Sequence, residues 1–169
     1  MRIKMILILS IFLMVIFTNC SDKGQIEREE ANQIIKILYK YGFANEINTF
    51  SKTCTKDLVL DGTITMDYWF HLEEQDTIIK VLEDIDFFSL PDTLSYQPDD
   101  SVVVSISPDP GIQSLRINYI SQDKTVYWYI FNSYPSEYER ILRITALLKE
   151  ILESDSEYQS LPEPTGGYD

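Results

Sequence analysis

A tight turn between two runs of strand-forming residues is the strongest local signal in this chain. Residues 55–60 (TKDLVL) and 63–70 (TITMDYWF) lie on either side of Asp61-Gly62. An Asp-Gly pair readily adopts the positive φ angles that a two-residue hairpin turn requires. The sequence therefore predicts an antiparallel hairpin that turns at Asp61-Gly62.

The residues after this hairpin have the spacing of an amphipathic helix. Residues 73–86 carry apolar side chains at intervals that place them on one helical face. Asp76 with Thr77 can cap the helix, and the acidic residues before it suit the positive end of the helix dipole. Pro91 prevents the helix from continuing. The apolar positions of the predicted helix are Ile78, Ile79, Val81, Leu82 and Ile85.

The same order of signals appears again later in the chain. Residues 114–120 (SLRINYI) and 125–131 (TVYWYIF) predict a second hairpin around residues 121–124. Residues 133–136 lead into a long amphipathic helix. Both halves place a Tyr-Trp pair near the end of the second strand, so an internal duplication is one interpretation and two independent amphipathic helices are the other. The apolar residues of the second helix are Tyr138, Ile141, Leu142, Ile144, Leu147, Leu148, Ile151 and Leu152.

Two further segments have the pattern of strands. The apolar residues Ile35, Ile37, Tyr39 and Tyr41 alternate along the chain, which is typical of a half-buried strand. A helix is the competing interpretation, but isoleucine and tyrosine favour strands. Residues 102–107 (VVVSIS) predict another strand before a turn rich in proline.

These elements predict an α+β domain, because helices gathered on one face of an antiparallel sheet define that class. We expect an antiparallel sheet of about six strands with two amphipathic helices on one face, in the order strands, helix, strands, helix. The domain is expected to cover residues 33–158. Residues 159–169 contain proline and glycine and offer little to bury, so we expect a flexible tail there.

The N-terminus has the composition of a secretory signal. Arg2 and Lys4 precede an apolar run over residues 5–17, which is shorter than the roughly 20 residues of a membrane span. Cys20 follows this run directly. The segment resembles the lipobox of bacterial lipoproteins, which implies cleavage of residues 1–19, acylation of Cys20 with palmitate or a similar chain, and attachment to the membrane. A plain secreted protein and an uncleaved anchor are the alternatives.

This resemblance also implies where the protein is found. Residues 20–32 then form the lipidated N-terminus and a polar tether, and Ser21 in the position after the cysteine favours sorting to the outer membrane of a diderm bacterium. After cleavage the chain has 12 basic and 27 acidic residues, a net charge of −15. Three short segments also resemble small uncharacterised bacterial lipoprotein domains of α+β fold, which implies a fold and an anchor but no activity: residues 61–63, 87–92 and 157–162.

Composition excludes several classes of function. One His and two Cys make a His/Cys metal site improbable, and a disulfide framework cannot form once Cys20 is acylated. The acidic balance argues against nucleic acid as a partner, because cationic side chains supply most of the affinity for phosphate. We expect no cofactor and no metal. Four aspartates in two loops could converge on Ca²⁺, but a twelve-residue calcium loop is missing from the sequence; these are Asp92, Asp99, Asp100 and Asp109.

No constellation of catalytic residues stands out. Cys54 with His71 could make a thiol dyad, yet nothing beside Cys54 would lower the pKa of its thiol, and we predict that Cys54 is buried. Carboxylate pairs for glycoside hydrolysis cannot be assigned among 27 acidic residues. We therefore predict that the protein is not an enzyme.

Aromatic side chains are the candidates for binding. Tyr127 and Tyr129 face one side of the last predicted strand, and Tyr68 and Phe70 face one side of an earlier strand. One set must pack under the helices, and the other can form an aromatic platform on an open sheet face. The sequence thus predicts a lipid-anchored envelope lipoprotein that binds an envelope protein or glycan through its sheet face or edge. The alternatives are an exported inhibitor or assembly accessory of an envelope enzyme and a carboxylate-based enzyme acting on glycans.

Overall fold

Alternate residues of the central strand are buried, and this pattern builds the domain. In the computed structural model, which describes residues 34–94, 111–129 and 136–168, strand β1 (Ile35–Tyr41) buries Ile35, Ile37 and Tyr39. Lys36 and Lys40 point to the opposite, exposed face. This two-residue period is the one predicted from the sequence, and it confirms a strand here rather than a helix.

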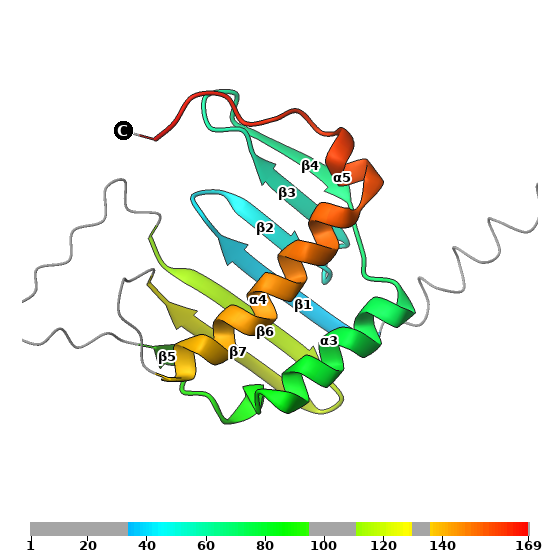
Figure 1. The fold of residues 1–169 in the computed structure, drawn as a ribbon, viewed down its shortest axis with the longest axis vertical. Helices are drawn as coiled ribbons and strands as arrows, with labels where there is room; N and C mark the ends of the chain where they lie inside the picture. Colours follow the sequence, from blue (N-terminus) through cyan, green and yellow to red (C-terminus); the bar gives the residue numbers. More distant parts are fainter. Residues whose placement is uncertain (1–33, 95–110, 130–135, 169) are drawn as a thin grey trace, which may run out of the picture. The chain divides into compact units, whose positions relative to one another are not determined.

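The described strands form one sheet in the order β4-β3-β2-β1-β6-β7-β5 (Figure 1). All neighbouring pairs are antiparallel except β5 with β7, which is parallel. The strands after β1 are β2 (Asn45–Asn48), β3 (Thr53–Asp57), β4 (Thr63–Asp67), β5 (Thr93–Leu94), β6 (Gln113–Tyr119) and β7 (Gln122–Trp128).

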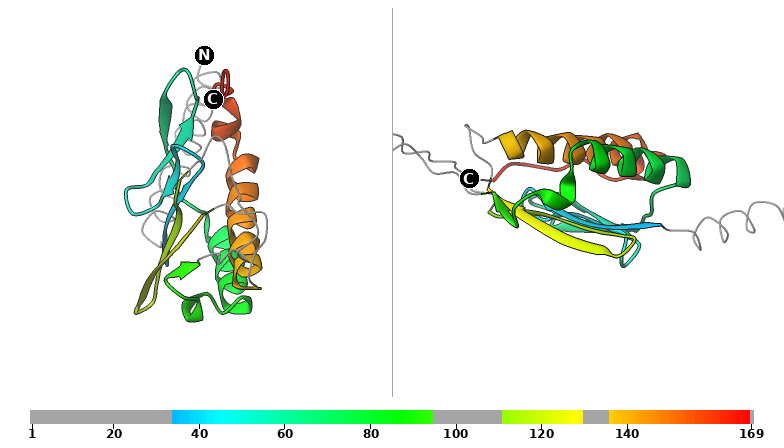
Figure 2. Two further views of the ribbon diagram at one scale, coloured as in Figure 1. Left: turned by 90° about the vertical axis from the view of Figure 1, so that its left-hand side faces the viewer. Right: turned by 90° about the horizontal axis from the view of Figure 1, so that it is seen from below.

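The helices all cover the same face of this sheet (Figure 2). They are α3 (Leu72–Asp84), the short 3-10 helix η1 (Phe87–Ser89), α4 (Ser136–Ser154) and α5 (Ser156–Ser160). Their apolar stripes and the inward side chains of the sheet form a single core, as the helical spacing predicted. The largest fully buried side chains include Phe70, Phe87, Ile37, Ile78, Ile117 and Ile144. No helix in the described ranges is long and apolar enough to cross a membrane.

The predicted α+β class is confirmed, and the sheet is mostly antiparallel. Its strand count and order differ from the prediction, because the short strands β2 and β5 lack a clear apolar alternation. β2 has only Ile47 buried, and β5 has two residues. The predicted strand at residues 102–107 lies outside the described residues.

Both predicted hairpins form, but both turns differ from the prediction. Asp57 pairs with Thr63, so the first turn is a five-residue loop over residues 58–62 rather than Asp61-Gly62 alone. In the second hairpin Tyr119 pairs with Gln122. The turn is therefore Ile120-Ser121, and β7 begins at Gln122 inside the segment predicted to be a loop.

Helix α3 begins earlier than predicted. His71 occupies the N-cap position, and the Glu74 carboxylate accepts a hydrogen bond from the His71 backbone N–H at 2.7 Å. This reciprocal arrangement of an N-cap and a glutamate three residues later is a capping box. The predicted cap at Asp76 and Thr77 is therefore wrong: both residues lie inside the helix.

The C-terminal segment makes specific contacts where a loose tail was expected. Helix α5 extends to Ser160, past the expected domain end at Tyr158. Thr165 then forms a parallel bridge to Val59, in the loop between β3 and β4. Tyr168 stacks on Phe43 with 3.6 Å between the ring centroids. The described residues, tail included, belong to one compact unit that begins at Ile34.

Candidate functional site: a groove at the outer edge of β7

The outer edge of β7 is the side of this strand that faces away from β6. Tyr127 donates its backbone N–H to the carbonyl of Asp92 at 2.9 Å, so its backbone groups point outward. Alternate residues of an antiparallel strand turn their backbone groups to the same side. The N–H and C=O groups of Asp123 and Thr125 therefore also point outward. Strand β5 pairs with β7 only from Tyr127 onward, and within the described ranges no other strand covers Asp123 and Thr125.

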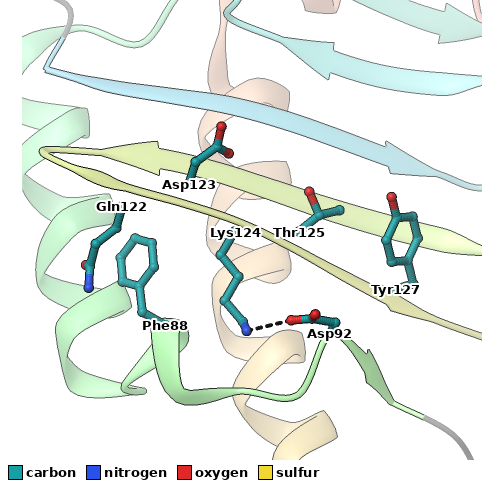
Figure 3. A pocket seen from close by; sticks show the side chains of 7 residues that line it. All are labelled: Phe88, Asp92, Gln122, Asp123, Lys124, Thr125 and Tyr127. Atoms are coloured by element: carbon teal, nitrogen blue, oxygen red, sulfur yellow. Dashed lines mark hydrogen bonds and ion pairs between the residues drawn. The ribbon is translucent and has the colours of Figure 1, made fainter.

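Two adjoining cavities of about 480 and 370 Å³ lie along this edge. Figure 3 shows the larger one, between β7 and the chain that leads into β5. The smaller one lies between α3, η1 and the tip of the β6–β7 hairpin. Phe88 and Gln122 line both, so we treat them as one feature and call it the β7-edge groove. Its remaining lining residues are Asp92, Asp123, Lys124, Thr125 and Tyr127 in the larger cavity, and Ile79, Leu82, Glu83, Asp86, Phe87, Tyr119 and Ile120 in the smaller.

An ion pair crosses the larger cavity. The Lys124 ammonium lies 2.8 Å from a carboxylate oxygen of Asp92 (Figure 3). The Lys124 side chain is mostly covered, while the Asp92 side chain is exposed. Asp92 thus holds two groups of β7, the Lys124 ammonium through its carboxylate and the Tyr127 N–H through its carbonyl. These contacts fix the separation between the strand edge and the opposite wall.

The wall opposite β7 is built by the turn that follows α3. Asp86 adopts a left-handed backbone conformation with φ of 48°, which redirects the chain into η1. Phe87 is then buried in the core, and Phe88 packs edge-on against it at 5.4 Å between ring centroids. Because Phe87 anchors the turn, Phe88 is left partly exposed as an apolar surface inside the groove.

The tip of the hairpin places an apolar residue in an unfavourable position. Ile120 has a φ of 55° and its side chain is 78% exposed. A β-branched residue in the left-handed region is a genuine outlier, because its Cβ clashes with the backbone. Strain of this kind is found most often at functional positions. The smaller cavity includes Ile120, so the strained residue belongs to the groove.

The structure divides the predicted aromatic residues into two groups. Tyr127 and Tyr129 are 46% and 41% exposed, as expected for side chains on an open face. Tyr68 and Phe70 are buried, at 4% and 1%, and their rings pack edge to face at 5.2 Å. Both residues come directly after β4 in the sequence, and their side chains lie in the core beneath the helices. They cannot contribute to an exposed aromatic platform.

The sheet face opposite the helices mixes charged side chains with aromatic ones. Arg116 on β6 forms a bidentate ion pair with Asp123 on β7, with N–O distances of 2.9 and 2.6 Å. The hydrogen bonds from Arg116 lower the pKa of the Asp123 carboxyl. The Arg116 guanidinium also lies 4.7 Å from the centroid of the Phe50 ring. Charged groups therefore lie among the aromatic side chains of this face, which makes it a poor apolar platform.

Cys54 and His71 do not have the properties of a catalytic thiol dyad. Cys54 is fully buried, as predicted. Burial, with the nearby charges of Asp155 and Glu46, raises the pKa of its thiol to about 12. A reactive cysteine needs the opposite shift. His71 serves as the N-cap of α3.

Within the ranges that the structure describes, no three His, Cys, Asp or Glu side chains are grouped as metal ligands. Asp92, considered for Ca²⁺, pairs with Lys124 instead. Asp99, Asp100 and Asp109 lie outside the described residues, as does the predicted lipidation site, Cys20.

Sequence reasoning did not find most of the groove. It named Tyr127 and the possibility of edge binding, but it assigned Gln122 and Lys124 to a loop and gave Phe88 no binding role. Nothing in the sequence pointed to Ile120, because the prediction placed this residue at the end of a strand; the structure places it in the turn. Comparisons of the chain with family models, with curated proteins and with solved structures found no match. The binding site is therefore inferred from the geometry of the domain, and the anchor from the N-terminal sequence.

Proposed function

We propose that this protein is a lipid-anchored envelope lipoprotein whose α+β domain binds an extended segment of a partner envelope protein at the β7-edge groove. The mode of binding is strand addition, in which main-chain hydrogen bonds supply affinity and alternate side chains supply specificity. Its role is to hold a partner near the membrane, and it needs no catalytic group.

The observation that carries the proposal is a strand edge that no other strand in the described ranges covers at Asp123 and Thr125, with a groove beside it. The outward backbone groups of Asp123 and Thr125 provide two donors and two acceptors for an added strand. The adjoining cavities, of about 480 and 370 Å³, provide space for its side chains. An edge strand without such a partner is a liability that proteins usually protect.

The second edge of the sheet provides a contrast. The outer strand there is β4, and its exposed side chains are Thr63, Thr65 and Asp67. Charged side chains on an edge discourage pairing. β7 also has two, but each is already held in an ion pair, Asp123 with Arg116 and Lys124 with Asp92. At β7, in contrast, the exposed apolar surface of Ile120 and Phe88 lies beside the unpaired backbone groups.

The anchoring part of the proposal comes from the sequence before the described domain. A basic start, a short apolar run and Cys20 resemble the signal of bacterial lipoproteins. More than one acyl chain on Cys20 would hold the protein firmly, since a single chain binds a membrane only marginally. The polar tether over residues 20–32 would leave the groove accessible to neighbouring envelope proteins.

Site-specific photo-crosslinking in the native envelope tests the binding site. A photoreactive amino acid replaces Gln122, which lines both cavities, or Thr65 on the β4 edge as the matched control. We expect Gln122 to crosslink to one protein, with the crosslinks mapped by mass spectrometry to a single extended segment. Crosslinking at Thr65 should not yield that protein.

A proline substitution distinguishes strand addition from other contacts. Thr125→Pro removes an outward N–H, which an edge strand tolerates, so the fold is retained while the added strand loses a hydrogen bond. Thr65→Pro makes the same change on the β4 edge. We expect only Thr125→Pro to abolish the crosslink at Gln122, with the melting temperatures of both variants reported alongside. Equal crosslinking in the two proline variants would contradict the proposal.

Labelled palmitate tests the anchor separately. Cys20→Ala should lose the label and leave the membrane fraction, whereas Cys54→Ala should keep both. If the label persists on Cys20→Ala, the lipoprotein assignment is wrong.

A further inference from the structure

We infer that the segment bound at the β7-edge groove has apolar side chains at alternate positions and a basic side chain beside Glu83. This inference rests on the proposed function and specifies the chemistry of the partner.

The apolar alternation follows from the position of the groove on the helix-covered side of the sheet. Side chains of a strand added to β7 would point alternately to the polar sheet face and toward the helices. On the helix side they would meet Leu82, Phe88 and Ile79, which line the smaller cavity. Each apolar side chain placed there removes apolar surface from water on both partners. A polar side chain at the same positions would lose its hydration with little in return.

The basic residue follows from the charges that line the groove. Four acidic residues line it, Glu83, Asp86, Asp92 and Asp123, against one lysine, Lys124. Three of the four form ion pairs with basic side chains, which offset their negative charge. The pairs are Asp92 with Lys124 at 2.8 Å, Asp123 with Arg116 at 2.6 Å, and Asp86 with Arg140 at 3.8 Å.

Glu83 is the exception. It lies near the end of α3 and lines the smaller cavity. In the part of the chain that the structure describes, no basic side chain forms an ion pair with it. The negative charge of the whole chain adds a long-range attraction for a basic partner. Glu83 therefore marks the end of the groove where a lysine or arginine of the partner would lie.

A second copy of this chain does not fit the same edge. If β7 paired antiparallel with itself through Asp123 and Thr125, Lys124 would lie directly opposite Lys124 of the second copy. Like charges in directly opposed positions destabilise a strand pair. Two cleaved chains, each with a net charge of −15, also repel each other. The chemistry favours a basic partner over self-association.

Three synthetic peptides of about seven residues, a usual strand length, test the inference on the full chain in detergent. Each has an alternating valine and threonine core; one has terminal lysines, one has terminal glutamates, and one has terminal lysines with a central proline. Fluorescence anisotropy gives their affinities at low and high salt. We expect the lysine peptide to bind at least about tenfold more tightly than the glutamate peptide at low salt, with the difference shrinking at high salt.

Glu83→Gln assigns the charge effect to one residue, with Glu150→Gln on the exposed face of α4 as the control. We expect Glu83→Gln to weaken the lysine peptide about two- to fivefold, as for an exposed ion pair, and Glu150→Gln to leave it unchanged. Equal affinities for the two charged peptides, or no effect of Glu83→Gln, would overturn this inference while leaving the crosslink at Gln122 intact. Absence of a crosslink from Gln122 in the otherwise unaltered protein would overturn the proposed function instead. A dimer in sedimentation that Thr125→Pro abolishes would show that the edge binds a second copy.

Discussion

At the scale of single residues, Ile120 has two properties that lower the stability of the unbound protein. Its positive φ strains the backbone, and its exposed side chain leaves apolar surface in water. Glycine has no Cβ and adopts positive φ freely. A glycine would therefore suit this turn better in the unbound chain, so the isoleucine side chain is best explained by a bound partner.

We predict that Ile120→Gly separates stability from binding. The melting temperature should stay the same or rise, because relief of about 1–2 kcal/mol of strain offsets the flexibility of glycine. Affinity for the lysine peptide should fall, because the smaller cavity loses an apolar wall. Calorimetry and fluorescence anisotropy measure the two effects. A clear loss of stability with unchanged affinity would show that Ile120 serves the fold.

One cysteine and several tyrosines with titratable side chains are buried in the core. Cys54 lies among tyrosines, and burial raises the pKa of Tyr39, like that of Cys54, to about 12. Burial also raises the pKa values of Tyr41 and Tyr68 above the usual value. In the unfolded chain the same groups lose their protons near pH 9 to 10.

This difference predicts that stability falls at alkaline pH. Because the folded state holds these protons more tightly, the contribution is complete below pH 9 and is lost as the pH rises toward 12. Cys54→Ala removes the group that titrates first. Its free energy of unfolding, from urea titrations at pH 8, 9 and 10, should fall less steeply with pH than that of the wild type. Parallel pH profiles would contradict the raised pKa of Cys54.

At the scale of elements, long periodic segments could be predicted and short ones could not. Of the eight apolar residues predicted for helix α4, Leu142 is exposed and Leu147 and Ile151 are partly buried. The structure buries the other five, Tyr138, Ile141, Ile144, Leu148 and Leu152. The signal is strong because several turns repeat it. Strand β5 has only two residues, and its place beside β7 depends on a hydrogen bond to Asp92 that no local pattern encodes.

The groove was hard to predict for the same physical reason. Its walls come from η1, the end of α3 and the β6–β7 hairpin, which meet only after the sheet has formed. The C-terminal segment is a similar case. Thr165 alone forms hydrogen bonds with Leu58, Leu60 and Asp61 in the β3–β4 loop, about a hundred positions earlier in the chain. A single residue leaves no repeated pattern in the sequence.

The C-terminal segment provides a test of packing with internal controls. Gly166 has a φ of +78°, and a Cβ there would lie 2.7 Å from a methyl carbon of Leu60. Gly62 has a φ of +77° but no neighbour within 4 Å, and Gly167 has neither constraint.

We predict that Gly167→Ala is neutral, that Gly62→Ala costs about 1 kcal/mol from backbone strain, and that Gly166→Ala also detaches the segment. Detachment should appear as faster amide exchange at Thr165, whose N–H donates to the Leu58 carbonyl at 3.2 Å. Unchanged exchange at Thr165 in Gly166→Ala would show that the segment adjusts without leaving its site.

At the scale of the whole molecule, the charge of the chain and the geometry of the sheet both favour the outer edge of β7 as the binding site. The chain is strongly acidic, and its exposed sheet face is occupied by paired charges such as Arg116 with Asp123. We therefore expect specific recognition where backbone groups and apolar side chains are exposed together, at the outer edge of β7. An acidic surface would then steer a basic partner toward that edge and discourage self-association.

Amide hydrogen exchange at β7, followed by NMR on the full chain in detergent, tests this account most directly. In the free protein, the amides of Asp123 and Thr125 should exchange rapidly, and those of Lys124 and Val126, which face β6, should be protected. Addition of the lysine peptide should protect Asp123 and Thr125 without changing the other two. Slow exchange at Asp123 and Thr125 in the free protein would mean that the edge is already covered, and the account would be wrong.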